Sequence, residues 1–420
     1  MSVAIANIQQ EHVSIGLPTI NEASFGFKPD VDNNQIIFGL KGINGVNTSI
    51  SQAILENRPF NSFDDFCERM LDSGLIKNSQ MIKLVKGGCF TKIDSENIKE
   101  TMEKYIKRYV ISPCKKLTLS QLNRMEEMDI IPEEFKNELL IISFKKYIKN
   151  SEAYELYIAP NKKIPKKGYH DRRMLLSESA MNFFRDNFSE SSVTDVVNGR
   201  YVISENLFNK EADKTIIPFK KWMESEEALN KYNKALFSEA MNKHASGTVE
   251  HWCMEALCYY SGKHELDDVD EKQYGIINYF DLPRQPEAYD HYTFYVNGEK
   301  KERPKYIISR IIGTVLNADN NHHSVALLTK YGVVNVKFHK GRYAYYNKRI
   351  STKADAEKKK TVLEESWFKR GNLIAVCGIR RDDQFYSMIY KDTIYKHTVN
   401  LVKEIKSDGT LLLQSERTKV

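Results

Sequence analysis

FGLKGINGVNTSISQAI, residues 38–54, combines regularly spaced apolar residues with three glycines and one lysine, and it contains no acidic residue. A phosphate-binding P-loop would need a Lys-Ser or Lys-Thr pair directly after its second glycine, and this stretch has none. A dinucleotide-binding fingerprint would need the spacing G-x-G-x-x-G, whereas Gly39, Gly42 and Gly45 are each three residues apart. Both nucleotide-binding loops are therefore excluded, and the glycines must serve another purpose.

Residues 41–47 have the pattern of a helix-hairpin-helix element, in which apolar residues flank a tight glycine turn that opens a helix. Backbone N–H groups at such a turn and at the helix N-terminus have no intrahelical acceptor, so a phosphate oxygen can accept from them. Glycine lets a nucleic-acid backbone approach closely, and such contacts ignore base sequence. The predicted DNA contacts are Lys41, Gly42, Asn44, Gly45 and Asn47, with Lys86, Gly87 and Gly88 at a second glycine turn. A plain β-turn leading into a helix would give the same pattern, so both interpretations stay open.

The bulk composition limits the class of protein. The chain has 420 residues, 41% hydrophobic and 28% charged, which is enough for two to four domains with cores of their own. No run of 18 apolar residues occurs, and the N-terminus has no basic region ahead of an apolar stretch, so neither a membrane span nor a signal peptide is predicted and a cytoplasmic location is expected. The six cysteines form no C-x-x-C pair. Cys253 and Cys258 lie near His251 and His264, but their spacing fits no common zinc motif, which favours buried or free thiols.

Positive charge is unevenly distributed along the chain. Residues 330–381 contain 14 Lys and Arg against four acids, and residues 145–173 contain nine against three, although the whole chain carries only +6. Local excess of this kind is typical of a polyanion-binding surface. A solvated basic face with no partner is the alternative.

The residue patterns predict an α+β fold, mostly helical in the N-terminal two-thirds with helix-hairpin-helix elements, followed by a five-stranded OB-type β-barrel. Ser49 and Ser51 are predicted to cap a helix that Pro59 ends, Asn61 or Ser62 to cap the next, and Gly87-Gly88 to end a third. The segment 160–173, with two prolines and a glycine, is predicted to be an exposed basic loop. After about residue 300, five short runs rich in Val, Ile and Leu alternate with turns, with one longer insertion at about 341–366.

Four segments then point to a known family, in the order LPTINEASFGF, IIFGLKGINGVN, NRPFNSFDDFCERM and LVKGGCF. Residues 15–94, which contain them, resemble the bacterial C-family replicative polymerases, the DNA polymerase III alpha subunits. HWCMEALCYYSGKHEL (251–266) and the strand-rich segments after residue 310 resemble the part of those proteins that leads into and forms their OB domain. The sequence departs from the family at Asn47, where glycine is usual, and at Ile50, where alanine is usual.

The resemblance implies a domain organisation and a partner. It implies an end-of-fingers segment at 1–40, a helix-hairpin-helix region at 41–94, a helical connecting region at 95–265, a linker at 266–299 and an OB domain at 300–420. The metal-binding aspartates of the family lie in a palm upstream of everything matched here. No cofactor is therefore expected on this chain. A separate upstream catalytic polymerase chain is expected to supply the aspartates and their Mg²⁺, and a sliding clamp is a further partner that the family would allow, although no clamp-binding peptide is evident.

One pair of acids imitates a metal-binding strand. Asp30 and Asp32 follow Pro29 at alternate positions, but the family has a variable polar turn there and no third acid supports them. They are therefore interpreted as non-catalytic, and the chain is not expected to be catalytic alone.

The predicted barrel carries basic and aromatic residues suited to single-stranded DNA. Bases stack on aromatic rings in a basic groove of OB folds, at roughly 1–3 kcal/mol per base. The predicted contacts in this region are Arg310, Lys337, Lys340, Arg342, Tyr343, Tyr345, Lys369, Arg370, Arg380 and Arg381. Phe338 and one of the neighbouring tyrosines are assigned to the core, because strand residues alternate between the two faces.

Two functions from different classes remain. The first is the DNA-binding C-terminal portion of a replicative polymerase, holding duplex and single-stranded template for a catalytic chain. The second is a free-standing single-stranded-DNA-binding or processivity protein. A repair nuclease with helix-hairpin-helix elements is disfavoured, since no carboxylate or histidine cluster is apparent.

Overall fold

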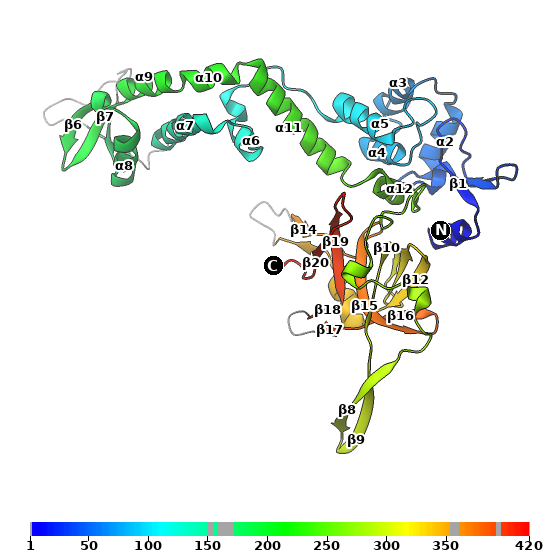
Figure 1. Ribbon diagram of the computed structural model, residues 1–420. Helices are drawn as coiled ribbons and strands as arrows, with labels where there is room; N and C mark the ends of the chain where they lie inside the picture. The colour runs from blue at the N-terminus through cyan, green and yellow to red at the C-terminus, as the bar shows by residue number, and fades with distance from the viewer. Residues whose placement is uncertain (1, 150–153, 158–171, 353–360, 392–395, 420) are drawn as a thin grey trace. The chain divides into compact units, whose positions relative to one another are not determined.

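A computed structural model describes residues 2–149, 154–157, 172–352, 361–391 and 396–419 (Figure 1). The chain divides into two compact units, one formed by Met1–Tyr105 with His244–Val420 and the other by Ile106–Lys243. Within the described residues, no helix is long and apolar enough to cross a membrane. The predicted basic loop at 160–173 lies almost wholly outside the described residues.

The N-terminal part of the first unit is a small sheet followed by helices. Strand β3 (Gln35–Ile37) lies between β1 (Ser14–Gly16) and β2 (Lys28–Asp30). The helical elements of this part are α1 (Ser2–Gln10), the 3₁₀ turn η1 (Leu40–Gly42), α2 (Thr48–Glu56), α3 (Phe63–Phe66), the π-helical turn η2 (Cys67–Asp72), α4 (Asn78–Lys86) and α5 (Ile98–Tyr105). Of the two predicted caps, Asn61 and Ser62, it is Ser62 that caps α3, because its hydroxyl accepts from the Asp65 amide. Buried aromatic rings hold these helices together, with Phe66 packed edge-on against Phe90.

The C-terminal part of the first unit is a closed five-stranded barrel of OB type. Its strands are β10 (Ser309–Asp319), β11 (Ser324–Thr329), β12 (Gly332–Lys337), β15 (Leu373–Arg381) and β16 (Gln384–Ser387). They pair in the ring β10-β11-β12-β16-β15 and back to β10, and only the β12–β16 pair is parallel. This is the Greek-key barrel expected from the sequence. Inward-facing apolar residues such as Val325, Leu327 and Val336 fill it.

Other elements surround the barrel. The insertion between β12 and β15 contains α13 (Lys340–Asn347), β13 (Ile350–Ser351) and β14 (Val362–Glu364), and two short strands, β17 (Tyr390–Lys391) and β18 (Lys396–His397), follow β16. Strands β19 (Val399–Ile405) and β20 (Leu411–Gln414) extend the sheet from β15, joined by the predicted Ser-Asp-Gly turn, in which Gly409 has a φ of +80°. Helix α12 (Val249–Leu257) precedes the barrel.

The segment predicted as a linker, 266–299, contains ordered structure. Two 3₁₀ turns, η7 (Lys272–Tyr274) and η8 (Tyr279–Asp281), lead into a long antiparallel hairpin of β8 (Ala288–Val296) and β9 (Glu299–Tyr306), which crosses the predicted boundary at residue 300. Its turn is Asn297-Gly298, with φ values of +51° and +84°, as a two-residue hairpin requires. Figure 1 shows the hairpin extending away from the barrel.

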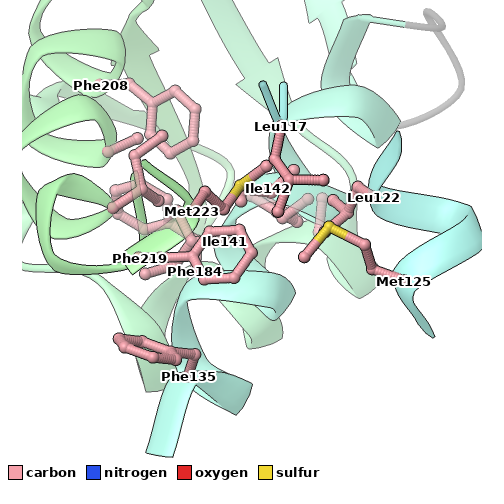
Figure 2. Packing of buried hydrophobic residues seen from close by; sticks show 14 of the residues in the cluster. Leu117, Leu122, Met125, Phe135, Ile141, Ile142, Phe184, Phe208, Phe219 and Met223 are labelled. Carbon is pink, nitrogen blue, oxygen red and sulfur yellow. The ribbon is translucent and has the colours of Figure 1, made fainter. Parts of the chain in front are cut away.

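The second unit combines helices with a sheet that was not predicted. Strands β4 (Tyr154–Leu156), β5 (Arg173–Leu176), β7 (Arg200–Ser204) and β6 (Val193–Val197) pair antiparallel in that order. Its helices are α6 (Leu122–Glu127), α7 (Lys136–Lys149), α8 (Glu178–Asn187), α9 (Glu205–Thr215), α10 (Ile217–Met223) and α11 (Glu226–His244), with short turns η3 (Ile106–Val110), η4 (Leu119–Gln121), η5 (Glu133–Phe135) and η6 (Glu190–Ser192). One hydrophobic cluster joins them, in which Phe184 and Phe208 lie close to Ile142 and Met223 (Figure 2). This unit therefore has a core of its own inside the region predicted as a connection.

Candidate nucleic-acid interface

The hairpin between η1 and α2 is a tight turn held by its own backbone. The Val46 amide donates to the Ile43 carbonyl over 3.0 Å, and Gly45 has a φ of +86°. Ile43 and Val46 are buried, whereas Asn44 and Gly45 are exposed. The predicted apolar flanks therefore anchor the turn and leave its tip at the surface.

Helix α2 begins two residues earlier than predicted. Asn47, and neither Ser49 nor Ser51, is its N-cap, because the Asn47 Oδ1 accepts from the Ile50 amide over 2.9 Å. This cap explains how asparagine can occupy a position where the polymerase family that the sequence resembles usually has glycine. The first two helical residues, Thr48 and Ser49, are exposed, and the first turn contains no acid. Their amides have no intrahelical acceptor, so they are placed to donate to an anion.

Lys41 is exposed beside this turn, with its Nζ 5.2 Å from the centre of the Phe25 ring. Gly42 serves packing: a Cβ on it would lie 2.6 Å from a ring carbon of Phe38. Its lack of a side chain is therefore required by the core and does not by itself indicate a phosphate contact.

The second glycine turn lies in the interior, which corrects its prediction as a DNA contact. Gly87 and Gly88 end α4 in a Schellman motif: the Cys89 amide donates to the Leu84 carbonyl, the Gly88 amide donates to the Val85 carbonyl, and Gly88 has a φ of +69°. Both glycines are buried. The amides that could have met a phosphate are thus used to close the helix.

Lys86 is also unavailable to DNA, because its side chain is buried and paired. It is only 5% exposed, and its Nζ lies 2.5 Å from the Glu255 carboxylate, which also binds Lys83. Burial alone would raise the pKa of Glu255, but the hydrogen bonds from Lys83 and Lys86 outweigh it and lower this pKa to about 2. Glu255 therefore stays ionised and fixes both lysines against α12.

The end of α12 also fixes the hairpin itself. The Asn44 amide donates to the Ala256 carbonyl over 2.8 Å, and the Asn44 side chain donates to the Glu255 carbonyl over 3.2 Å. Gly45 lies next to the Lys83 side chain. The hairpin, α4 and α12 therefore form one supported surface.

The turn before β15 joins this surface to the barrel. Arg370 donates to the Leu316 carbonyl over 2.9 Å and to the Cys258 sulfur over 3.1 Å. Lys369 is exposed. Burial is the main cause that lowers the pKa of Lys86, and the positive charge of Lys369 lowers this pKa further. Lys369 and Arg370 therefore lie near the α4–α12 contact. Their positions in the sequence do not predict this proximity.

The remaining predicted barrel residues do not share one groove. Arg380 and Arg381 lie at the far end of β15 from Lys369, and this nine-residue strand is roughly 30 Å long. Arg380 is committed to backbone carbonyls, including that of Leu282 at 2.8 Å, whereas Arg381 is exposed beside the Tyr386 ring.

Segment 340–347 is helical, which corrects the expectation of strand alternation there. Tyr343 and Tyr346 are one helical turn apart and face the core; Tyr343 is 3% exposed and donates to the Asn320 side chain over 2.8 Å. Its ring is therefore closed to base stacking. Tyr345 is 53% exposed and Lys340 is exposed. The half-buried Lys337 and Arg342 lie on β12 and α13, and Arg310 contributes to a separate cavity.

Helix α1 covers the barrel face that OB folds commonly use for oligonucleotides, the face of the second and third strands. Ala6 belongs to a hydrophobic cluster against which Val3 of α1, Ala326 and Leu328 of β11 and Val333 of β12 also pack. DNA that approached this face would have to displace α1.

Asp30 and Asp32 show no metal-site geometry. The Asp30 carboxylate accepts from the Gln35 and Asn33 side chains, each over 2.9 Å, and these hydrogen bonds lower its pKa. Among the residues that the structure describes, no group of three or more His, Cys, Asp or Glu side chains is arranged to hold a metal ion.

Comparison with known proteins gives a family match for the segment that contains the hairpin and α4. Residues 12–99 match the helix-hairpin-helix motif family. Over 417 residues, 99% of its length, the chain is 40% identical to a probable DNA polymerase YorL of Bacillus subtilis (strain 168) and to a DNA-directed DNA polymerase of Bacillus phage SPbeta. It spans about 31% of the length of each of these relatives. The helix-hairpin-helix match supports DNA binding by this chain.

Sequence reasoning missed Lys83 and Glu255, which support the helix-hairpin-helix turn. Lys83 and Lys86 are one helical turn apart on α4, so their shared face could have been recognised. Their common partner is 172 and 169 positions away, and no local signal identifies it.

Proposed function

We propose that this chain is the DNA-holding portion of a replicative DNA polymerase of the C-family type, acting with a separate catalytic chain. The observation that carries the proposal is the exposed N-terminus of α2 behind the Asn44–Gly45 turn, in a segment that matches the helix-hairpin-helix motif. The similarity of nearly the whole chain to two proteins named as DNA polymerases supports it.

In this proposal the turn grips the DNA backbone and not the bases. The amides of Thr48 and Ser49 donate to a phosphate, the helix dipole favours the negative charge, and Lys41 adds an ion contact. Lys369 extends the positive surface toward the barrel. The partner chain would supply the metal-binding aspartates and the Mg²⁺ that they hold.

Salt dependence of binding tests the backbone grip. Affinity for a primer–template duplex, measured by fluorescence anisotropy, is expected to fall with salt, and Lys41→Ala is expected to reduce the slope of log K against log salt by about 0.9. Lys406→Ala, at an exposed lysine on the β19–β20 turn, is the matched control and should keep the slope. A salt-independent affinity would contradict phosphate binding.

Primer extension tests whether DNA synthesis requires a separate catalytic chain. The chain would be assayed with Mg²⁺ and nucleotides, alone and with the polypeptide encoded immediately upstream. Synthesis only in the mixture is expected, and synthesis by this chain alone would contradict the proposal. No synthesis in either tube, with tight binding to single strands, would favour the free-standing single-stranded-DNA-binding protein, which the closed OB-type barrel makes the second candidate.

A further inference from the structure

A cavity of about 550 Å³ lies in the first unit, on the outer side of the barrel. It is bounded by the start of β10, by β15 and β19, and by the chain around Tyr274. Its polar lining includes Arg310, His397 and Asn400, and Tyr390 contributes an aromatic ring. The volume falls within the range of small-molecule sites, and no residue of the hairpin at 41–47 lines it.

Arg310 carries a positive charge into this cavity, and none of the ion pairs found among the described residues involves it. Its guanidinium donates to the Tyr274 carbonyl over 3.2 Å and contacts the His397 Nε2. Among the described residues no Asp or Glu oxygen lies within ion-pair distance of it. Cations withdrawn from water are normally paired, so the cavity favours a ligand that presents hydrogen-bond acceptors.

Asn400 contributes the complementary group. It is 2% exposed, and its Nδ2 donates to the Ser415 hydroxyl over 2.8 Å, which orients the amide. Its Oδ1 is buried and has no hydrogen-bond partner among the described residues. A buried acceptor without a donor is unfavourable, so a ligand N–H group near Asn400 would be stabilising.

The cavity also offers a surface for a flat group. The rings of Tyr390 and His397 lie 5.4 Å apart, and Ile277, Ile308 and Leu413 supply apolar walls. A ligand that joins a planar ring to neighbouring acceptor and N–H donor atoms would use all of these features.

We propose that this cavity binds a nucleobase, with an acceptor edge toward Arg310 and an N–H group toward the Asn400 Oδ1. Each DNA base carries a hydrogen-bond acceptor beside a donor on its pairing edge, and aromatic side chains stack on bases of any sequence. The base could belong to a free deoxynucleotide or to an unstacked position of a bound single strand. The strand source rests on the proposed function, whereas the free-nucleotide source does not.

Equilibrium dialysis with the four deoxynucleoside monophosphates tests the base site directly. The full chain is expected to bind at least one of them saturably, one molecule per chain. Asn400→Leu should weaken binding at least tenfold, and so should Ile277→Trp, which fills the cavity from an exposed wall position and leaves the buried polar groups intact. Lys403→Met, at an exposed residue of the same strand as Asn400, should bind as the wild type does. Equal binding of deoxyribose 5-phosphate, or full binding by both cavity variants, would overturn base recognition.

A second arm distinguishes the source of the base. A single-stranded oligonucleotide in which one position is abasic should bind the wild type at least tenfold more weakly than the intact strand, and Asn400→Leu should remove that difference. This outcome assigns the base to a strand; nucleotide binding without it assigns the base to a free nucleotide. If the monophosphates do not bind and the abasic position has no effect, the base site is refuted. The affinity for duplex DNA, and its change in the Lys41→Ala variant, still test the proposed function separately.

Discussion

Replacing Glu255 by glutamine should loosen the support of the helix-hairpin-helix turn without changing its shape. Glutamine keeps the size of the side chain but removes the charge that holds Lys83 and Lys86. The two lysines would then lie close together with no counter-ion, and Lys86 would remain buried. The α4–α12 contact, and with it the anchor of Asn44, should open more often.

The pKa of Glu255 gives the magnitude and the sign. A pKa of about 2 against an ordinary value of 4.5 corresponds to about 3 kcal/mol at about 1.36 kcal/mol per pH unit. The Glu255 side chain is 29% exposed, so solvent screening reduces the figure to about 1–2 kcal/mol. Because folding lowers this pKa, the stabilisation is complete above about pH 4.5 and is lost as the pH falls toward 2.

Hydrogen exchange followed by mass spectrometry would measure this effect locally. Peptides covering residues 40–47 and 79–90 should exchange roughly 5–30 times faster in Glu255→Gln than in the wild type at pH 7, and the difference should largely disappear near pH 2. Glu68→Gln, at an exposed glutamate of the same unit, should leave both peptides unchanged. Unaltered exchange at pH 7, or a difference that persists at pH 2, would refute the electrostatic reasoning.

Three further results are expected. Gly45→Val forces a β-branched residue to a φ of +86° at a cost of about 1–3 kcal/mol, so the affinity for duplex DNA should drop. Gly26→Ala, where a Cβ meets nothing within 4 Å, is the control and should bind as the wild type does. Equal affinities of the Gly45→Val variant and the wild type would argue against DNA binding by this turn. Arg417→Met breaks a buried ion pair with Glu364 and should lower the free energy of unfolding of the barrel by about 3–5 kcal/mol in urea titrations. A loss below about 1 kcal/mol would be inconsistent with burial of the pair. Cys114 is partly exposed and the other five cysteines are buried, so a thiol reagent should modify one thiol per native chain rapidly and six after denaturation; several fast thiols would contradict the packing.

Local chemistry explains why the barrel could be predicted from the sequence. Four of its five strands lie in short runs rich in Val, Ile and Leu, and outside the barrel the predicted Ser-Asp-Gly turn joins β19 to β20. The turn at Gly45 was predicted for the same reason, since glycine at a positive φ leaves a local signature. The sheet of the second unit escaped prediction, because its strands are three to five residues long and lie among helices.

Burial explains why some of the predicted contact residues lie in the interior. Tyr343 and Tyr345 are alike in sequence terms, but the helix at Lys340–Asn347 turns one into the core and the other to solvent. Gly87 and Gly88 look like an exposed turn until the packing of Leu257 and Leu17 against them is known.

The sequence by itself determined the turn at Gly45 and the strand-rich character of the region that forms the barrel, because dihedral preferences and apolar alternation act between near neighbours. Only the tertiary structure decided which charged side chains are exposed and which are buried. Lys41 and Lys86 carry the same charge beside similar glycine turns, yet one is exposed and the other is buried against Glu255, 169 positions away. Ion pairing and burial depend on distances in space, and residues so far apart in the chain leave no local pattern from which that distance could be read.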